Sequence, residues 1–274
     1  MDILLRATAV AESRHFWFRG FRWFVTPLVR RATMDRQKPR ILDCGCGTGA
    51  NIELLDRFGV SYGFDLSEVG LYIGRELGRK CLVRASVTAA PFPSERFDLV
   101  TCFDVLNTLQ EADERVAIAE MYRLTRRGGF VLINVAAMKV LRGDHSVLSR
   151  EVRRYTRDSL ARLVTGAGFE IVRLTYTHAA LFLPLLLIRT LHRVRGLAQE
   201  ADAQSEIAVP PSPINAVLSG LLWCESLASR VGGVMPFGSS LLCLARKAEA
   251  SPPEARTMRR DSGGRQVRGA SPSR

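Results

Sequence analysis

The hydrophobic and polar positions of the chain change period several times between residues 40 and 135. Short apolar runs, which are typical of buried strands, alternate with segments whose apolar residues recur every three or four positions, as in amphipathic helices. This pattern predicts strands at 40–44, 60–65, 81–85, 97–104 and 130–135. It predicts helices at 51–58, 67–77 and 112–124. Such alternation indicates an α/β domain with a parallel sheet, right-handed crossovers and helices on both faces.

The segment 43–49, Asp-Cys-Gly-Cys-Gly-Thr-Gly, joins the first expected strand to the first expected helix. Its alternate glycines, Gly45, Gly47 and Gly49, supply unusual backbone angles and let a ligand lie against the main chain. The start of the helix offers free N–H groups to a negative part of that ligand. The next expected strand ends at Asp65, where a carboxylate can hold the diol of a ribose. The pattern therefore predicts a nucleoside-binding half-site.

The glycines alone leave the cofactor open. Gly45-x-Gly47-x-x-Ala50 also fits the dinucleotide fingerprint, so one alternative is an NAD-type Rossmann oxidoreductase. A purely structural turn is a second reading of the same residues. A third is a non-catalytic module that binds a membrane or a partner and has kept a nucleoside-binding fold.

Further motifs follow the glycine turn in a fixed order. They are Gly-Phe-Asp-Leu-Ser at 63–67, Ala-Pro-Phe-Pro at 90–93, Phe-Asp-Leu-Val at 97–100, Asp-Val-Leu-Asn at 104–107, Glu-Met-Tyr-Arg-Leu at 120–124 and Arg-Gly-Gly-Phe-Val-Leu-Ile at 127–133. As a set they resemble the type 11 group of class I S-adenosylmethionine-dependent methyltransferases. The resemblance implies a Rossmann-like class I methyltransferase fold: a seven-stranded, mostly parallel sheet with a C-terminal antiparallel strand pair. It also implies S-adenosyl-L-methionine as the cofactor.

The same resemblance assigns residues to the cofactor. Those expected to contact it are Asp43, Gly45, Cys46, Gly47, Gly49, Asp65, Leu66, Ser86, Val87 and Asp104. Asp65 would hold the ribose diol, and the backbone of 45–49 would lie beside the methionine moiety. Ser86 departs from the family pattern, which usually has an acid near this position to hold the adenine amino group. Ser86 brings no charge, so we expect a weaker adenine contact there.

The loop after the fifth strand carries two candidate catalytic residues, His145 and Tyr155. Histidine titrates near neutral pH, so His145 could orient or deprotonate the methyl acceptor, with Tyr155 beside it. The alternative is a loop histidine that only bonds the backbone. Methyl transfer asks little of side chains, because the sulfonium is a good leaving group and alignment supplies most of the acceleration. The acceptor is expected to be a small molecule, a sugar or a lipid-linked compound.

Segments on either side of 40–135 are assigned separate roles. Residues 1–39 carry a cluster of aromatic and arginine side chains at 14–24, expected to form a helical lid over the cofactor or, alternatively, a helix packed on the sheet. Residues 40–248 are expected to form the methyltransferase domain. Its last two strands are predicted at 170–177 and 239–246, with an insertion, 178–238, between them. Residues 249–274 lack hydrophobic periodicity and are expected to be a disordered tail.

The insertion 178–238 begins with an apolar run, 179–188, that is too short to cross a bilayer. A helix this apolar on every side must be covered by another segment, another subunit or lipid. Arg189, Arg193 and Arg195 follow the run, where they could meet lipid phosphates. We therefore expect a helical cap on the acceptor side that handles an apolar or membrane-resident substrate. Packing of the run against an expected second helix, 214–231, is the alternative.

Charge and cysteine content add two expectations. The chain has 39 Lys and Arg against 27 Asp and Glu, a formal net charge of +12, which favours acidic partners such as phosphorylated substrates or an anionic membrane face. Arginine-rich genome composition would give the same excess, and no specific nucleic-acid partner is expected. None of the six cysteines forms a C-x-x-C pair, so no metal site is expected. With no recognisable secretory leader, this predicts a cytoplasmic protein, with peripheral contact at the inner face of the membrane.

Overall fold

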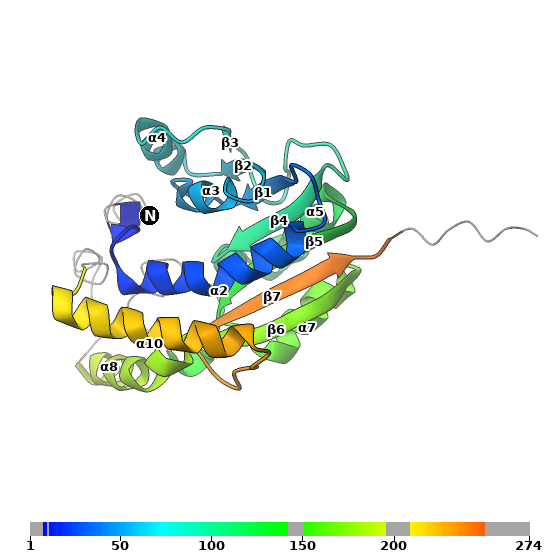
Figure 1. The fold of residues 1–274 in the computed structure, drawn as a ribbon. Helices are drawn as coiled ribbons and strands as arrows, with labels where there is room; N and C mark the ends of the chain where they lie inside the picture. The colour runs from blue at the N-terminus through cyan, green and yellow to red at the C-terminus, as the bar shows by residue number, and fades with distance from the viewer. Residues whose placement is uncertain (1–7, 10, 142–150, 196–208, 250–274) are drawn as a thin grey trace, which may run out of the picture.

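A computed structural model describes residues 8–9, 11–141, 151–195 and 209–249 (Figure 1). Its centre is a seven-stranded sheet of order β3-β2-β1-β4-β5-β7-β6. The strands are β1 (Arg40–Cys44), β2 (Val60–Asp65), β3 (Leu82–Arg84), β4 (Phe97–Phe103), β5 (Thr125–Ala136), β6 (Phe169–Thr177) and β7 (Ser240–Lys247). All neighbours pair in parallel except β7, which is antiparallel to β5 and to β6. The predicted fold class is confirmed.

Helices cover both faces of the sheet. They are α2 (Phe16–Thr33), α3 (Ala50–Leu55), α4 (Glu68–Glu76), α5 (Glu111–Leu124), α7 (Arg157–Gly166), α8 (Phe182–Arg195) and α10 (Ser212–Arg230), with short 3-10 turns η1 (Leu106–Thr108), η2 (Lys139–Leu141) and η3 (Ala179–Leu181). Successive strand residues alternate between two cores, as the two-residue period requires. Leu42 and Val100 pack in the core that includes α5 and α7, whereas Ile41 and Leu99 pack in the core that includes α2 and α3. Both faces of the sheet are therefore covered by helices.

Several predicted boundaries hold because their signals are local. β1 and β2 have the predicted bounds. The start of α7 is set by a contact that is equally local, because the Thr156 Oγ1 accepts from the Ser159 N–H at 3.2 Å and so caps the helix. β5 starts earlier than predicted, at Thr125, because its first residue pairs with Phe97 across the sheet. That pairing is non-local and leaves no signal in the apolar pattern.

The aromatic helix α2 is a layer of the fold. Phe24, Val25 and Val29 on its inner side are buried against strand residues such as Leu99 and Leu132. In Figure 1 the helix crosses the face of the sheet beside α10. Residues 16–33 thus pack on the sheet, as in the alternative reading, and a lid role for residues 1–39 stays a prediction.

The insertion 178–238 contributes α8 and α10. The α10 helix packs along α2, with Leu222 fully buried where Gly20 leaves room for it. The start of the run 179–188 packs against α10 as in the alternative reading, since Leu181 and Leu222 are buried in the same core, whereas Leu221 and Trp223 on α10 are 46% and 47% exposed. The side chains of Arg189, Arg193 and Arg195, like the tail 250–274, lie outside the described set. Within the described residues, no helix is long and apolar enough to cross a membrane.

Candidate functional site

The glycine turn is held against the end of β2. Gly45, Gly47 and Gly49 all have left-handed backbone angles, with φ of 76°, 56° and 80°. The N–H groups of Gly45 and Cys46 donate to the Phe64 carbonyl at 2.8 and 3.0 Å. A Cβ added to Gly45 would lie 2.3 Å from Cγ2 of Val105, so a side chain is excluded by space as well as by conformation. The turn is thus a tight, bulk-free loop at the carboxyl ends of β1 and β4.

Asp65 joins two segments at this edge of the sheet. One carboxylate oxygen accepts from the Gly47 N–H at 2.8 Å, and the other accepts from the Ser67 N–H at 2.7 Å. Each oxygen keeps a further lone pair, so the group can still accept hydrogen bonds from a ribose. The arrangement fixes the carboxylate directly beside the glycine turn, where the sequence predicted it.

Asp43 lies beneath the same edge and is 1% exposed. Its Oδ1 accepts from the Thr101 hydroxyl at 2.6 Å, whereas Oδ2 is buried without a partner among the described residues. Burial raises the pKa of Asp43 to about 7, the Thr101 hydrogen bond opposes this rise, and the charge of Asp65 adds to it. An unsatisfied buried carboxylate oxygen suits a cationic donor, because such a partner would offset its desolvation.

Asp104, the last predicted residue of this edge, has a strained backbone. Its φ of 59° places a non-glycine residue in the left-handed region. Asn134 holds this conformation from β5: its carbonyl accepts from the Asp104 N–H at 2.9 Å, and its side-chain amide donates to Asp104 Oδ1 at 2.9 Å. Strain of this kind is kept where the surrounding structure over-determines it, often at functional sites.

The predicted adenine side is formed by the loop after β3 and by Leu66. The Ser86 hydroxyl is engaged locally, 2.8 Å from the Thr88 hydroxyl, and also accepts from the Thr88 N–H. Val87 is half-buried against the core, and Leu66 is 65% exposed beside Asp65. The contacts available here are therefore apolar and neutral, in line with the weaker adenine contact expected at Ser86.

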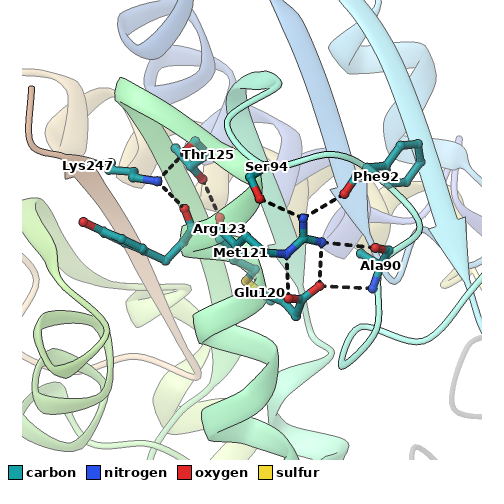
Figure 2. A network of polar contacts seen from close by, with 9 residues as sticks. Ala90, Phe92, Ser94, Glu120, Met121, Arg123, Thr125 and Lys247 are labelled. Atoms are coloured by element: carbon teal, nitrogen blue, oxygen red, sulfur yellow. Dashed lines mark hydrogen bonds and ion pairs between the residues drawn. The ribbon is translucent and has the colours of Figure 1, made fainter.

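An ion pair fixes the continuation of that loop (Figure 2). Arg123 is paired with Glu120 through two hydrogen bonds of 2.7 and 2.8 Å, and it also donates to the carbonyls of Ala90 and Phe92. Glu120 accepts from the Ala90 N–H at 3.2 Å. The hydrogen bonds from Arg123 lower the pKa of Glu120. Residues of the motifs 90–93 and 120–124 thus form one network. This network holds the loop next to the edge of the sheet that carries the predicted cofactor residues.

Residues 42–133 match a family model described as a methyltransferase domain. The chain carries a methyltransferase domain. The matched span runs from β1 through most of β5 and includes the glycine turn, Asp65 and the Arg123 network.

Known proteins that are similar to the chain include methyltransferases. The ubiquinone/menaquinone biosynthesis C-methyltransferase UbiE of Edwardsiella ictaluri is 30% identical over 154 residues, which are 50% of this chain and 58% of that protein. The chain therefore spans less than two thirds of that relative. Two solved structures share the fold at low sequence identity. The phosphoethanolamine N-methyltransferase 2 of Haemonchus contortus, in complex with S-adenosyl-L-methionine, has a TM-score of 0.56 at 17% identity and covers 91% of this chain and 58% of its own. The [4+2]-cyclase SpnF has a TM-score of 0.52 at 20% identity, covering 82% and 80%.

Of the two predicted catalytic residues, the structure describes Tyr155 but not His145. His145 lies outside the described residues, and its role stays a prediction. Tyr155 is 3% exposed, and its hydroxyl donates to the Leu106 carbonyl at 3.2 Å and to the Glu114 carboxylate. Burial and the Glu114 contact raise the pKa of Tyr155. A buried, hydrogen-bonded phenol of this kind is a structural group, so the geometry does not support Tyr155 as a base.

One part of the site had no signal in the sequence. Glu12, which precedes α2, accepts a hydrogen bond from the Thr48 hydroxyl at 2.8 Å. Arg79 pairs with Glu12 at 3.3 Å and also donates to the Thr48 carbonyl at 3.0 Å. Burial raises the pKa of Glu12, and its contacts with Thr48 and Arg79 oppose that rise. These three residues tie the N-terminal segment and the end of α4 to the glycine turn of the methyltransferase domain.

Proposed function

We propose that the protein transfers the methyl group of S-adenosylmethionine to a small-molecule acceptor. The observation that carries this proposal is the geometry at the end of β1 and β2: a left-handed glycine turn tethered to Asp65, above the unsatisfied oxygen of Asp43. Asp65 would accept from the ribose hydroxyls, and Asp43 would accept from the ammonium group of the methionine moiety. The cofactor supplies the activated methyl group, and these residues bind and orient it.

The oxidoreductase alternative is weaker on two grounds. The methyltransferase family model spans the glycine turn and continues through β5. In addition, the helix after the turn is only Ala50–Leu55, so its dipole offers little to the pyrophosphate of a dinucleotide. We therefore expect S-adenosylmethionine and S-adenosylhomocysteine to bind and NAD not to bind.

Asp65→Ala tests this function. The change should weaken S-adenosylmethionine binding by about 1–3 kcal/mol, because it leaves the ribose hydroxyls and the Gly47 N–H without their acceptor. Isothermal titration calorimetry gives the affinity directly. Glu68→Gln is the matched control, since it removes a nearby carboxylate that forms an exposed ion pair with Arg84. Calorimetry that detects NAD binding but no S-adenosylmethionine binding would refute the proposal.

We further propose that the acceptor has an apolar part and is met at a membrane surface. Leu183 and Leu187, one turn apart on α8, are 71% and 63% exposed. Val217 and Leu221, one turn apart on α10, are 64% and 46% exposed. Two apolar stripes of this kind are unusual on a solvated surface, and the positive net charge of the chain suits an anionic bilayer.

Flotation with liposomes tests the membrane contact. The protein should float with vesicles that contain anionic lipid, and less so at high salt, because part of the attraction is electrostatic. Val217→Ser combined with Leu221→Ser should reduce flotation, whereas Leu77→Ser should not, although Leu77 at the end of α4 is 54% exposed. A protein that stays in the soluble fraction under both salt conditions would contradict this part of the proposal.

A further inference from the structure

A hollow with a volume of about 140 Å³ lies between α2, α10 and the sheet, away from the glycine turn. Its lining includes three arginines from three different elements: Arg31 on α2, Arg173 on β6 and Arg230 on α10. In the strand order, β6 and β7 are separated from β1 and β2 by β4 and β5. In Figure 1, α10 lies toward the β7 and β6 side of the sheet with α2 beside it, whereas β1 and β2 lie toward the opposite edge. The hollow is therefore distinct from the proposed cofactor site.

Arg173 is held in place at the base of this hollow by neutral acceptors. Its Nη2 donates to the carbonyls of Ser229 and Gly233 at 2.6 and 2.7 Å, and it lies 3.2 Å from the Ser229 hydroxyl. These contacts fix the guanidinium but leave its charge uncompensated. Its Nε and Nη1 groups have no hydrogen-bond partner among the residues that the structure describes, so they can still donate to a ligand.

The positive charge of the hollow is not balanced by an acidic residue in its lining. No lining residue is an aspartate or a glutamate, and in the described part of the chain none of the three arginines takes part in an ion pair. Partial burial lowers the pKa of Arg173, and the charge of Arg31 lowers it further. Like charges gathered in a partly buried hollow disfavour one another, so the arrangement favours an anion that all three can contact.

The remaining walls limit the kind of anion. Arginine forks match the oxygens of a phosphoryl group, which carries more charge than a carboxylate and can face several guanidinium groups at once. The other walls of the hollow combine apolar side chains, such as Trp23, Phe24 and Leu242, with the hydroxyl-bearing residues Thr175, Ser226 and Ser229. A phosphoryl group attached to an apolar body fits both parts of this lining.

We propose that the Arg31–Arg173–Arg230 pocket binds the phosphoryl group of a ligand other than the methyl donor. This goes beyond the proposed methyl transfer, because none of the predicted cofactor residues lines the pocket. The phosphoryl group could belong to a soluble phosphate compound or to a lipid headgroup. The experiment below tests each source with its own probe.

The experiment measures binding of two probes to the full chain in a chloride buffer. Inorganic phosphate is titrated by calorimetry, and phosphatidylcholine vesicles with and without phosphatidic acid are tested by flotation. Arg31→Gln should lower the affinity for the bound probe about tenfold, as expected for one lost charge-assisted hydrogen-bond pair. Arg30→Gln is the matched control, because Arg30 is an exposed neighbour on α2 that does not line the pocket. Affinity for S-adenosylmethionine should be the same in both variants.

Binding of free phosphate that depends on Arg31 would support the pocket and indicate a soluble ligand. Binding of phosphatidic acid vesicles alone, again dependent on Arg31, would support it and indicate a lipid headgroup. Equal losses in Arg30→Gln and Arg31→Gln would show that only net charge matters and would overturn the proposal. So would the absence of binding by both probes. Because cofactor affinity is measured separately, failure of the pocket and failure of the methyltransferase proposal can be told apart.

Discussion

Replacing Gly45 with alanine should lower the free energy of unfolding by about 3 kcal/mol and prevent S-adenosylmethionine from binding normally. Part of the cost is the left-handed backbone, with φ of 76°, which a residue with a Cβ adopts at about 1–2 kcal/mol. The rest is steric, because the new Cβ would lie 2.3 Å from Val105, a stiff β-branched side chain. Denaturant unfolding and calorimetry measure the two effects.

Gly78 provides the control that separates these two costs. Its φ is 78°, nearly that of Gly45, but a Cβ added there would meet no atom within 4 Å. Gly78→Ala should therefore show the backbone cost alone. Combining Gly45→Ala with Val105→Ala should recover the steric part, since the clashing methyl group is gone. Equal losses for Gly45→Ala and Gly78→Ala would show that close packing at the glycine turn is unimportant.

Replacing Asp43 with asparagine should change how stability depends on pH. The pKa of Asp43 is raised from 3.8 to about 7, mainly by burial, so the folded state binds a proton that the unfolded state releases between these values. The stabilisation that this proton gives the folded state is complete below the pKa of Asp43 in the unfolded chain. It is lost as the pH rises through the pKa of Asp43 in the folded protein. The wild type should thus lose about 4 kcal/mol relative to Asp43→Asn between about pH 4 and about pH 8.

Denaturant unfolding of both proteins across this pH range measures the difference. Thr101→Val gives a second test, because the Thr101 hydrogen bond lowers the pKa of Asp43 and its loss should move the transition to higher pH. Added S-adenosylmethionine should reduce the loss in the wild type, since its ammonium group would stabilise the ionised carboxylate. Parallel stability curves for the wild type and Asp43→Asn would contradict the assignment of this pKa.

The sequence by itself determined the features that local chemistry specifies. The bounds of β1 and β2 could be predicted because apolar runs end at the glycine turn and at Asp65. The cap at Thr156 could be predicted because a threonine side chain bonds the backbone only three residues ahead. The glycine turn and the place of Asp65 beside it follow from one βαβ unit, whose handedness is nearly invariant.

Only the tertiary structure decided what covers each surface. The apolar side of α2 could have faced a ligand or the sheet, and a periodic pattern does not distinguish these, because it reports an apolar face without naming its partner. The contact of Glu12 with Thr48, the burial of Tyr155 and the gathering of Arg31, Arg173 and Arg230 each join segments far apart in the chain. Such contacts depend on how whole elements pack. The pKa of Asp43 depends on packing too, because it is raised mainly by burial rather than by neighbours in sequence.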